Sequence, residues 1–301
     1  MQRLRALSPL LLLYMKTLDQ ISTIGVAGAG VMGSGIAQVF AQAGYTVLLY
    51  DAFQESLDKG KANIEAFTNK AVEKGKMTEA VRAATLERIS YTTLVNDLTA
   101  DLVLEAIPEK LELKHHLFDK LEEINGPDTL LATNTSSISI TALAGKLQHP
   151  ERLVGLHFFN PAPLMKLVEV IAHERTAPEV TQLAEELAVK LGKVPAQVAD
   201  TPGFIVNRVA RFFYLESLRV LEERVADHQS IDRIMKSLGF RMGPFELMDL
   251  IGVDTNHLVT QTIYQDFFHE PRFRPSRIQQ KKVEAGAWGK KAGRGFYDYN
   301  N

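Results

Sequence analysis

The sequence contains no cysteine, so it can form no disulfide and no zinc–sulfur site, and it offers no thiolate nucleophile. Neither sign of charge dominates, because 34 Lys and Arg residues nearly balance 36 Asp and Glu residues. A net charge this close to zero gives no bulk attraction to nucleic acid or to an anionic membrane surface. We therefore expect a cytoplasmic protein with no nucleic-acid or membrane partner, in which local groups meet any anionic ligand.

Long apolar runs are also missing, since nothing approaches the roughly 18 residues of a membrane span. The start of the chain superficially resembles a secretory signal, with Arg3 and Arg5 ahead of Leu10–Leu13. That run is short, no small-residue cleavage site follows it, and an apolar strand begins only a few residues later. We expect residues 1–20 to be an N-terminal extension. Because Met15 falls at the natural start of such a domain, residues 1–14 are either an upstream extension or the result of a misplaced start codon, and we expect them to be peripheral or poorly ordered.

Residues 21–51 carry the strongest pattern in the chain. An apolar strand leads into a glycine turn, then an amphipathic helix, then a second apolar strand that ends on Asp51. This order predicts a dinucleotide-binding βαβ unit, in which one glycine makes the turn, one admits the pyrophosphate and one packs the helix on the strand. The helix N-terminus is then the pyrophosphate site. The cofactor contacts expected there are Gly28, Gly30, Val31, Met32 and Gly33.

Asp51 follows Gly28 by 23 residues, near the spacing expected for a carboxylate that binds the adenosine ribose. No arginine follows it closely to accept a 2′-phosphate. The sequence therefore predicts NAD rather than NADP as the cofactor.

Strand and helix patterns alternate as far as a turn at residues 200–203, and only helical patterns follow. We predict an α/β fold, with a Rossmann-type, mostly parallel sheet over residues 21–200 and a smaller all-α substrate and dimerisation domain over 201–301. Residues 53–90 are expected to form a helical hairpin that places Lys70 and Lys74 on one face. That face is either a solvated surface or a basic patch for a phosphorylated substrate tail.

Polar residues follow the predicted strands where ligands bind in such sheets, beyond the strand carboxyl ends. They are Ser136, His157, Asn160 and, at the start of the second domain, Asn207. The short connection at residues 160–163 predicts an antiparallel pair that brings His157 close to Glu169. A buried glutamate on one imidazole nitrogen would leave the other nitrogen to act as a base, as oxidation of a hydroxyl group requires.

Structural alternatives remain for this pair. His157 could be a satisfied core histidine, and Glu169 could instead pair with Lys166 or Arg152. The histidines show no metal-ligand spacing, and His115 and His116 are expected to be solvated on a charged helix, so no metal is predicted.

Six motifs occur in order over residues 20–301: GAGVMGSGIAQVFAQAGYTVLLYD, EAIPE, LLATNTSSISI, HFFNPAPLMKLVEVI, DTPGFIVNRV and GKKAGRGFYDY. Together they resemble the 3-hydroxyacyl-CoA dehydrogenases. The resemblance implies NAD-dependent oxidation of an (S)-3-hydroxyacyl-CoA to the 3-ketoacyl-CoA by a homodimer built through the helical domain. It also implies a short acyl chain, such as 3-hydroxybutanoyl-CoA, and fatty-acid β-oxidation, aromatic degradation and butanoate metabolism remain open as pathways.

Carried over by position, the resemblance makes His157 the general base and Glu169 its partner. Ser136 would hydrogen-bond the substrate oxygen and approach the nicotinamide ribose, and Asn207 would hold the reacting oxygen from the helical domain. Lys74 would bind the coenzyme A tail, although Phe67 stands where some members have a serine. The remaining matches to cofactor positions are Glu109, Lys114, Asn160 and Lys291.

Two other functions stay open. The chain could oxidise a free hydroxy acid, as a gulonate-type dehydrogenase does on the same fold, or it could be a catalytically idle NAD-binding protein. Retention of Lys74 and of Ser136, His157, Glu169 and Asn207 favours the acyl-CoA dehydrogenase over both. Related β-hydroxyacid dehydrogenases use a lysine of the second domain as the acid, and the His157 and Glu169 pair argues against them.

Overall fold

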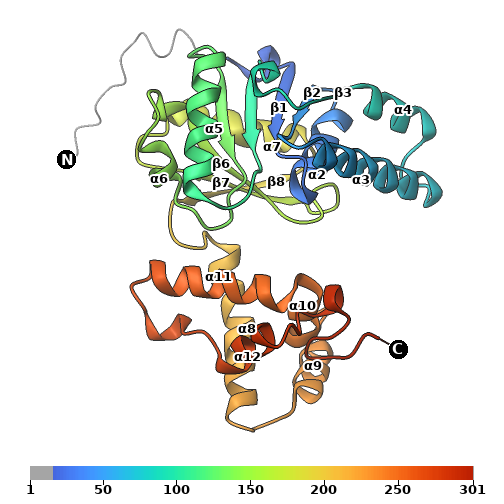
Figure 1. Ribbon diagram of the computed structural model, residues 1–301, viewed down its shortest axis with the longest axis vertical. Coiled ribbons are helices and arrows are strands. Elements are labelled where there is room, and N and C mark those ends of the chain that lie inside the picture. The colour runs from blue at the N-terminus through green and yellow to red at the C-terminus, as the bar shows by residue number, and fades with distance from the viewer. Residues whose placement is uncertain (1–15, 301) are drawn as a thin grey trace. The chain divides into compact units, whose positions relative to one another are not determined.

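The computed structural model describes residues 16–300, so most of the expected N-terminal extension lies outside the described residues. The chain divides into two compact units, and the division falls between Asp200 and Thr201. The first unit is a sheet covered by helices and the second is helical (Figure 1).

The first unit contains one eight-stranded sheet with the order β3-β2-β1-β4-β5-β6-β7-β8. All neighbouring strands are parallel except β6 and β7, which are antiparallel. This confirms the mostly parallel Rossmann-type sheet, with its antiparallel pair at the predicted short connection. The strands are β1 (Thr23–Ala27), β2 (Thr46–Tyr50), β3 (Ile89–Thr92), β4 (Leu102–Glu105), β5 (Leu130–Thr133), β6 (Leu153–Phe158), β7 (Leu167–Ala172) and β8 (Val194–Ala199).

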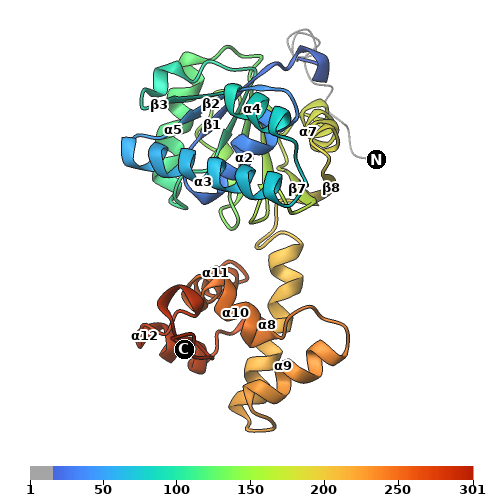
Figure 2. The same cartoon turned by 90° about the vertical axis from the view of Figure 1, so that its right-hand side faces the viewer.

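Helices cover both faces of this sheet, and α5 and α7 lie on opposite sides of it (Figure 2). The central strands are therefore buried on both faces, which is why they appear in the sequence as continuous apolar runs. The helices and short 3-10 turns of this unit are η1 (Leu18–Gln20), α2 (Val31–Gln42), α3 (Gln54–Glu73), α4 (Glu79–Glu87), η2 (Val95–Asp97), α5 (Leu111–Ile124), α6 (Ile140–Ala144), η3 (Pro150–Arg152) and α7 (Pro178–Lys190).

The expectation of a purely helical stretch over residues 53–90 is wrong at its end. Helices α3 and α4 form the expected hairpin, but Ile89 begins strand β3, which pairs in parallel with β2. A strand of four residues is too short for its alternation of apolar and polar side chains to be distinguished from the end of a helix. The pairing with β2, rather than local pattern, selects the strand.

The second unit packs its helices around a core that includes Tyr214, Leu218, Phe245 and Met248. Its elements are all helical, as predicted for the residues after the turn at 200–203, and none of the helices in the described part of the chain has the length and apolar content of a membrane span. The elements are α8 (Val206–Glu222), α9 (His228–Ser237), α10 (Pro244–Ile251), α11 (Val253–Asp266), η4 (Pro271–Phe273), α12 (Arg277–Glu284) and η5 (Lys290–Ala292).

Candidate functional site

The glycine turn after β1 has the geometry that binds a dinucleotide pyrophosphate. Gly28 has φ 108°, a left-handed conformation that disfavours a side chain. A Cβ at Gly33 would overlap the Gly28 carbonyl oxygen, so only glycine lets α2 begin this close to the turn. A Cβ at Gly30 would meet no atom within 4 Å, which leaves open space for a ligand at the start of α2.

Asp51 lies directly after β2 and its carboxylate reaches this turn. One carboxylate oxygen accepts the backbone N–H of Ala29 at 2.9 Å, and the other accepts that of Phe53 at 3.1 Å. These bonds hold the carboxylate beside the glycine turn, where a ribose attached to the pyrophosphate would lie.

His157 and Glu169 are direct partners across β6 and β7. The Nδ1–H of His157 donates to Oε2 of Glu169 at 2.7 Å, and their side chains are 5% and 1% exposed. The predicted meeting of these two side chains is confirmed. Arg152, the alternative partner considered for Glu169, pairs with Glu122 at 3.2 Å. Because Nδ1 is committed to the carboxylate, any proton transfer by this imidazole would use Nε2.

Residues 134–139 form the loop that follows β5, and β5 is the neighbour of β6, the strand that carries His157. The side-chain oxygen of Asn134 accepts the backbone N–H of Phe158 at 2.8 Å, which ties the ends of β5 and β6 together. The loop then passes Ser136 and enters α6, where Asp200 accepts the N–H groups of Ile140 and Thr141. The loop is therefore fixed at both ends.

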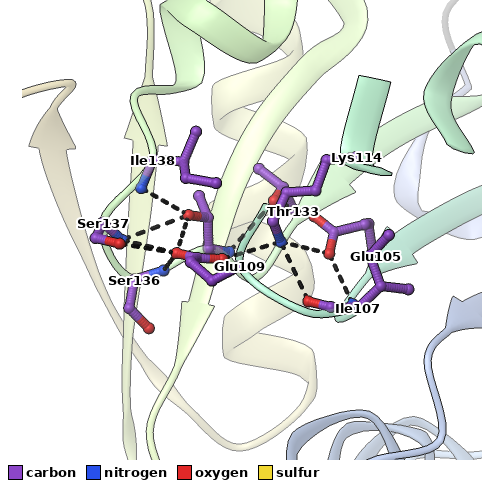
Figure 3. A network of polar contacts seen from close by, with 9 residues as sticks. Glu105, Ile107, Glu109, Lys114, Thr133, Ser136, Ser137 and Ile138 are labelled. Atoms are coloured by element: carbon purple, nitrogen blue, oxygen red, sulfur yellow. Dashed lines mark hydrogen bonds and ion pairs between the residues drawn. The ribbon is translucent and has the colours of Figure 1, made fainter. Parts of the chain in front are cut away.

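A single carboxylate oxygen of Glu109 holds the middle of this loop (Figure 3). It accepts the Thr135 hydroxyl at 2.5 Å, the backbone N–H groups of Ser136 and Ser137 at 2.9 and 3.0 Å, and the Ser137 hydroxyl at 3.1 Å. The Ser136 side chain points away from Glu109 in Figure 3. Glu109 thus fixes the backbone of Ser136 while leaving its hydroxyl directed elsewhere.

Lys114 connects Glu109 to a second acid, Glu105, at the end of β4. Its ammonium lies 2.5 Å from Glu105 and 3.1 Å from Glu109, and its side chain is 1% exposed. Glu105 also accepts the Ile107 backbone N–H at 2.7 Å and the Thr133 hydroxyl at 2.6 Å. The two carboxylates and one ammonium therefore join α5, the ends of β4 and β5, and the loop of Ser136 (Figure 3).

The two acids of this network have opposite pKa shifts. Burial raises the pKa of Glu105 above its ordinary value, and the nearby Lys114 only partly opposes that effect. Burial acts on Glu109 in the same direction, but the Lys114 ammonium and the Thr135 hydroxyl outweigh it and hold the pKa of Glu109 below its ordinary value. Glu109 is therefore the acid that stays ionised as the loop anchor.

Three residues of this network, Glu105, Thr133 and Thr135, are not among those predicted from the sequence. Glu105 carries the signal that identified Glu169, an acid inside an apolar strand run, and a buried acid requires partners. The two threonines carry no comparable signal, because their partners lie 26 to 28 residues away in the chain.

A cleft of about 380 Å³ lies beside the glycine turn, between α2, α3 and the turn at residues 160–163. Lys70 and Phe67 of α3 line it together with Asn160. Gln38 of α2 also lines it, and its amide nitrogen is buried without a hydrogen-bond partner. Lys74 lies one turn beyond Lys70, at the C-terminal end of α3. The cleft thus combines an apolar surface, an unused amide and a basic rim.

Two predicted site residues belong to the helical unit. Asn207 is the second residue of α8, and Lys291, in η5, pairs with Asp254 at 2.7 Å. His115 corrects an expectation, because it is 6% exposed and its Nε2 donates to the Ala142 carbonyl at 3.0 Å instead of lying in solvent. It faces α6 and not water, since it lies on the covered side of α5. Among the described residues, no group of three or more His, Asp or Glu side chains has a metal-binding arrangement.

Comparison with known proteins extends the likeness over both units. Residues 23–201 match a family model described as the NAD-binding domain of 3-hydroxyacyl-CoA dehydrogenase, and residues 203–299 match the C-terminal domain of the same family. The fold and the NAD cofactor predicted from the sequence are thereby confirmed.

Individual relatives cover nearly the whole chain. A 3-hydroxyadipyl-CoA dehydrogenase of Escherichia coli is 50% identical over 93% of this chain, which spans 59% of that protein. A Deinococcus radiodurans protein named "Probable 3-hydroxybutyryl-CoA dehydrogenase" is 45% identical over 91% of this chain and 99% of its own length. The crystal structure of (S)-3-hydroxybutyryl-CoA dehydrogenase from Ralstonia eutropha shares 39% identity and a TM-score of 0.89, covering 94% of this chain and all of that one.

Proposed function

Because this chain belongs to the 3-hydroxyacyl-CoA dehydrogenase family, we propose that it oxidises the 3-hydroxyl group of an (S)-3-hydroxyacyl-CoA to a ketone with NAD. The observation that carries this proposal is the buried pair of His157 and Glu169, at the same edge of the sheet as the glycine turn. A histidine base beside a dinucleotide site is what removal of a hydroxyl proton and a hydride requires.

His157 Nε2 takes the proton of the substrate hydroxyl. Bound NAD would supply the acceptor for the hydride of the carbon that carries this hydroxyl. Glu169 fixes the imidazole tautomer through Nδ1 and stabilises the imidazolium that forms. Both side chains are shielded from water, so the attraction between carboxylate and imidazolium is little screened. In the reverse direction the protonated histidine returns the proton to the ketone oxygen.

Ser136 and Asn207 would hold the oxygen on which this proton transfer occurs. Glu109 supports such a role for Ser136, because its carboxylate holds the loop that carries this residue. The Thr135 hydroxyl and the backbone N–H groups of Ser136 and Ser137 all donate to it within 3.0 Å. A hydroxyl donor on a fixed backbone is preorganised for the charge that develops on the oxygen. The role of Asn207 rests on the family resemblance.

The cleft beside α3 is the proposed site of the coenzyme A tail. Its apolar surface suits the pantetheine arm, and the Gln38 amide can hydrogen-bond an amide of that arm. Lys70 on its rim and Lys74 one turn further on can contact phosphate groups. Phe67 offers an apolar contact in place of a hydroxyl.

We also propose that the helical unit mediates a homodimer. Several of its large apolar side chains are strongly exposed, namely Val209, Leu258 and Phe268, which are 65%, 63% and 92% exposed. Exposed apolar side chains in such number favour an interface.

The test is the loss of NADH absorbance with acetoacetyl-CoA, measured beside free acetoacetate and beside NADPH. We expect turnover only with the CoA ester and NADH. Equal turnover of free acetoacetate would support the free hydroxy-acid alternative, and NADH binding without turnover of either substrate would contradict the proposal.

The three relatives reported above differ in the acyl group of their names, which is butyryl in two and adipyl in one. We propose a short chain of about four to six carbons. Relative rates with 3-ketoacyl-CoA esters of increasing length test this, and a maximum at long chains would contradict it.

A further inference from the structure

The connection between β6 and β7, residues 159–166, has few backbone donors to spare. Pro161 and Pro163 have no backbone N–H group. The N–H groups of Leu164 and Met165 both donate to the Pro161 carbonyl at 3.0 Å, so they close a turn within the connection itself. A carbonyl oxygen buried in this connection therefore needs a donor from another part of the chain or from water.

Lys193, directly before β8, supplies that donor. Its side-chain amine is buried and donates to the carbonyl of Ala162 at 2.6 Å and to that of Met165 at 2.9 Å. In the described part of the chain, no other side chain forms a hydrogen bond with this connection. The backbone N–H of Val194, the next residue, donates to the Lys166 carbonyl at 2.7 Å. The start of β8 therefore holds the connection at three of its carbonyl groups.

The end of α7 fixes the backbone from which the Lys193 side chain extends. Gly192 follows this helix with φ 71°, and its N–H donates to the Val189 carbonyl at 2.9 Å. The N–H of Lys193 donates to the Ala188 carbonyl, also at 2.9 Å. Together these two bonds form the motif that commonly ends a helix on a left-handed glycine. The amine therefore reaches the connection from a backbone whose conformation is set by the helix end.

The connection held by Lys193 is one wall of the cleft beside α3. Residues 160–163 line this cleft together with residues of α2 and α3. A Cβ at Gly35 of α2 would lie 3.4 Å from both Ala162 and Pro163, so α2 and the connection are in close contact there. Lys193 is not among the residues that line the cleft. Its hydrogen bonds therefore set the position of a wall that other residues form.

We propose that Lys193 is a positioning residue for the coenzyme A ester, because it holds residues 160–163 where they contact the pantetheine arm. This inference rests on the proposed function, since the cleft receives a coenzyme A tail only if the chain is a 3-hydroxyacyl-CoA dehydrogenase. Lys193 then affects binding of the ester and not the chemical step. His157 and Glu169 face each other through the antiparallel pairing of β6 and β7, in which Lys193 takes no part.

The experiment compares acetoacetyl-CoA with S-acetoacetyl-N-acetylcysteamine, which has the same thioester but lacks the nucleotide and most of the pantetheine arm. The readout is kcat/KM for NADH oxidation with each ester, expressed as the ratio of the first to the second. K193M leaves the Ala162 and Met165 carbonyls without their donor. We expect its ratio to fall about tenfold, the size of a loss worth about one hydrogen bond. Its kcat with saturating acetoacetyl-CoA should stay at the wild-type value.

Two further variants assign the effect to the hydrogen bonds of Lys193. K193Q keeps an amide donor on a side chain too short to serve both carbonyls, so its ratio should lie between those of K193M and the wild type, and it provides the test if K193M does not fold. K190M is the matched control, because Lys190 is exposed and lies over the ring of Tyr45; its ratio should equal that of the wild type. Because the readout is a ratio within one protein, a general loss of activity does not imitate the effect.

The outcomes separate the two proposals. An unchanged ratio in K193M, or in K193Q if K193M does not fold, shows that Lys193 is structural and overturns this inference, even where activity with both esters is lower. A fall in kcat with both esters by the same factor has the same meaning. Failure of the wild-type enzyme to oxidise NADH with acetoacetyl-CoA overturns the proposed function instead.

Discussion

Removal of the Lys114 ammonium should destabilise the sheet unit in a pH-dependent way. In K114M an unbranched apolar side chain replaces the ammonium, and Glu105, which is fully buried, loses its counter-charge. Removing one partner of a buried ion pair lowers the free energy of unfolding by about 3–5 kcal/mol. For a unit of this size that corresponds to a fall in Tm of about 6–20 °C.

The sign of the pH dependence follows from Glu105. Burial already raises its pKa in the folded protein, and loss of Lys114 removes the main group that opposes this rise. A carboxyl with a raised folded-state pKa binds more protons in the folded than in the unfolded chain, so its stability contribution falls as pH rises through that pKa. We therefore expect K114M to lose most stability relative to wild type near about pH 8 and less near about pH 5.5.

The assay is thermal unfolding of wild type and variants at both pH values. K120M is the matched control, because Lys120 lies on the same helix but is 40% exposed and pairs with Glu123; its effect should stay below about 1 kcal/mol. The double variant E105Q/K114M removes both charges and should be more stable than K114M at the higher pH. Equal losses for K114M at both pH values, or a loss no larger than that of K120M, would refute this account of the network.

Three further predictions concern binding and chemistry. H157Q should retain NADH binding, measured by fluorescence titration, and lower kcat by about 10²–10⁴-fold because the acid–base group is lost; near-normal kcat would contradict the assignment. G33A should weaken NADH binding and cost about 1–3 kcal/mol of stability, because its methyl group overlaps the Gly28 carbonyl oxygen; an unchanged Kd would show that the turn tolerates the shift. K70A/K74A should raise the KM for acetoacetyl-CoA about tenfold, equivalent to about 1.4 kcal/mol, while the KM for NADH stays constant; parallel rises in both would contradict a coenzyme A site on α3.

The predictions that the structure confirms rest on local constraints. The glycine positions in residues 28–33 follow from backbone geometry, because glycine is the residue without a side chain and can be recognised directly in the sequence. The contact of His157 with Glu169 follows from the antiparallel register of β6 and β7, since the connection between the two strands sets which of their residues face one another. In both cases the partners are close in sequence, so pattern and spacing determine the contact.

The features that sequence analysis did not find depend on partners far along the chain. Strand β3 forms because its backbone pairs with β2, and His115 is buried because α6 covers its side of α5. The anchor of the Ser136 loop joins Glu109 to groups 26 to 28 residues away. Such contacts become visible only when the order of the strands is known, because the order decides which loops meet at the sheet edge.

The buried cations of this chain are held in two ways, by acids or by neutral acceptors. At the sheet edge the buried Lys114 and His157 both have acids from neighbouring elements, so the charges there are balanced within the protein and serve to fix geometry. In the helical unit Arg211 has only amide and hydroxyl acceptors on one edge. Lys193 of the sheet unit is held in the same way as Arg211, by the backbone carbonyls of Ala162 and Met165, so the sheet unit contains both kinds of buried cation.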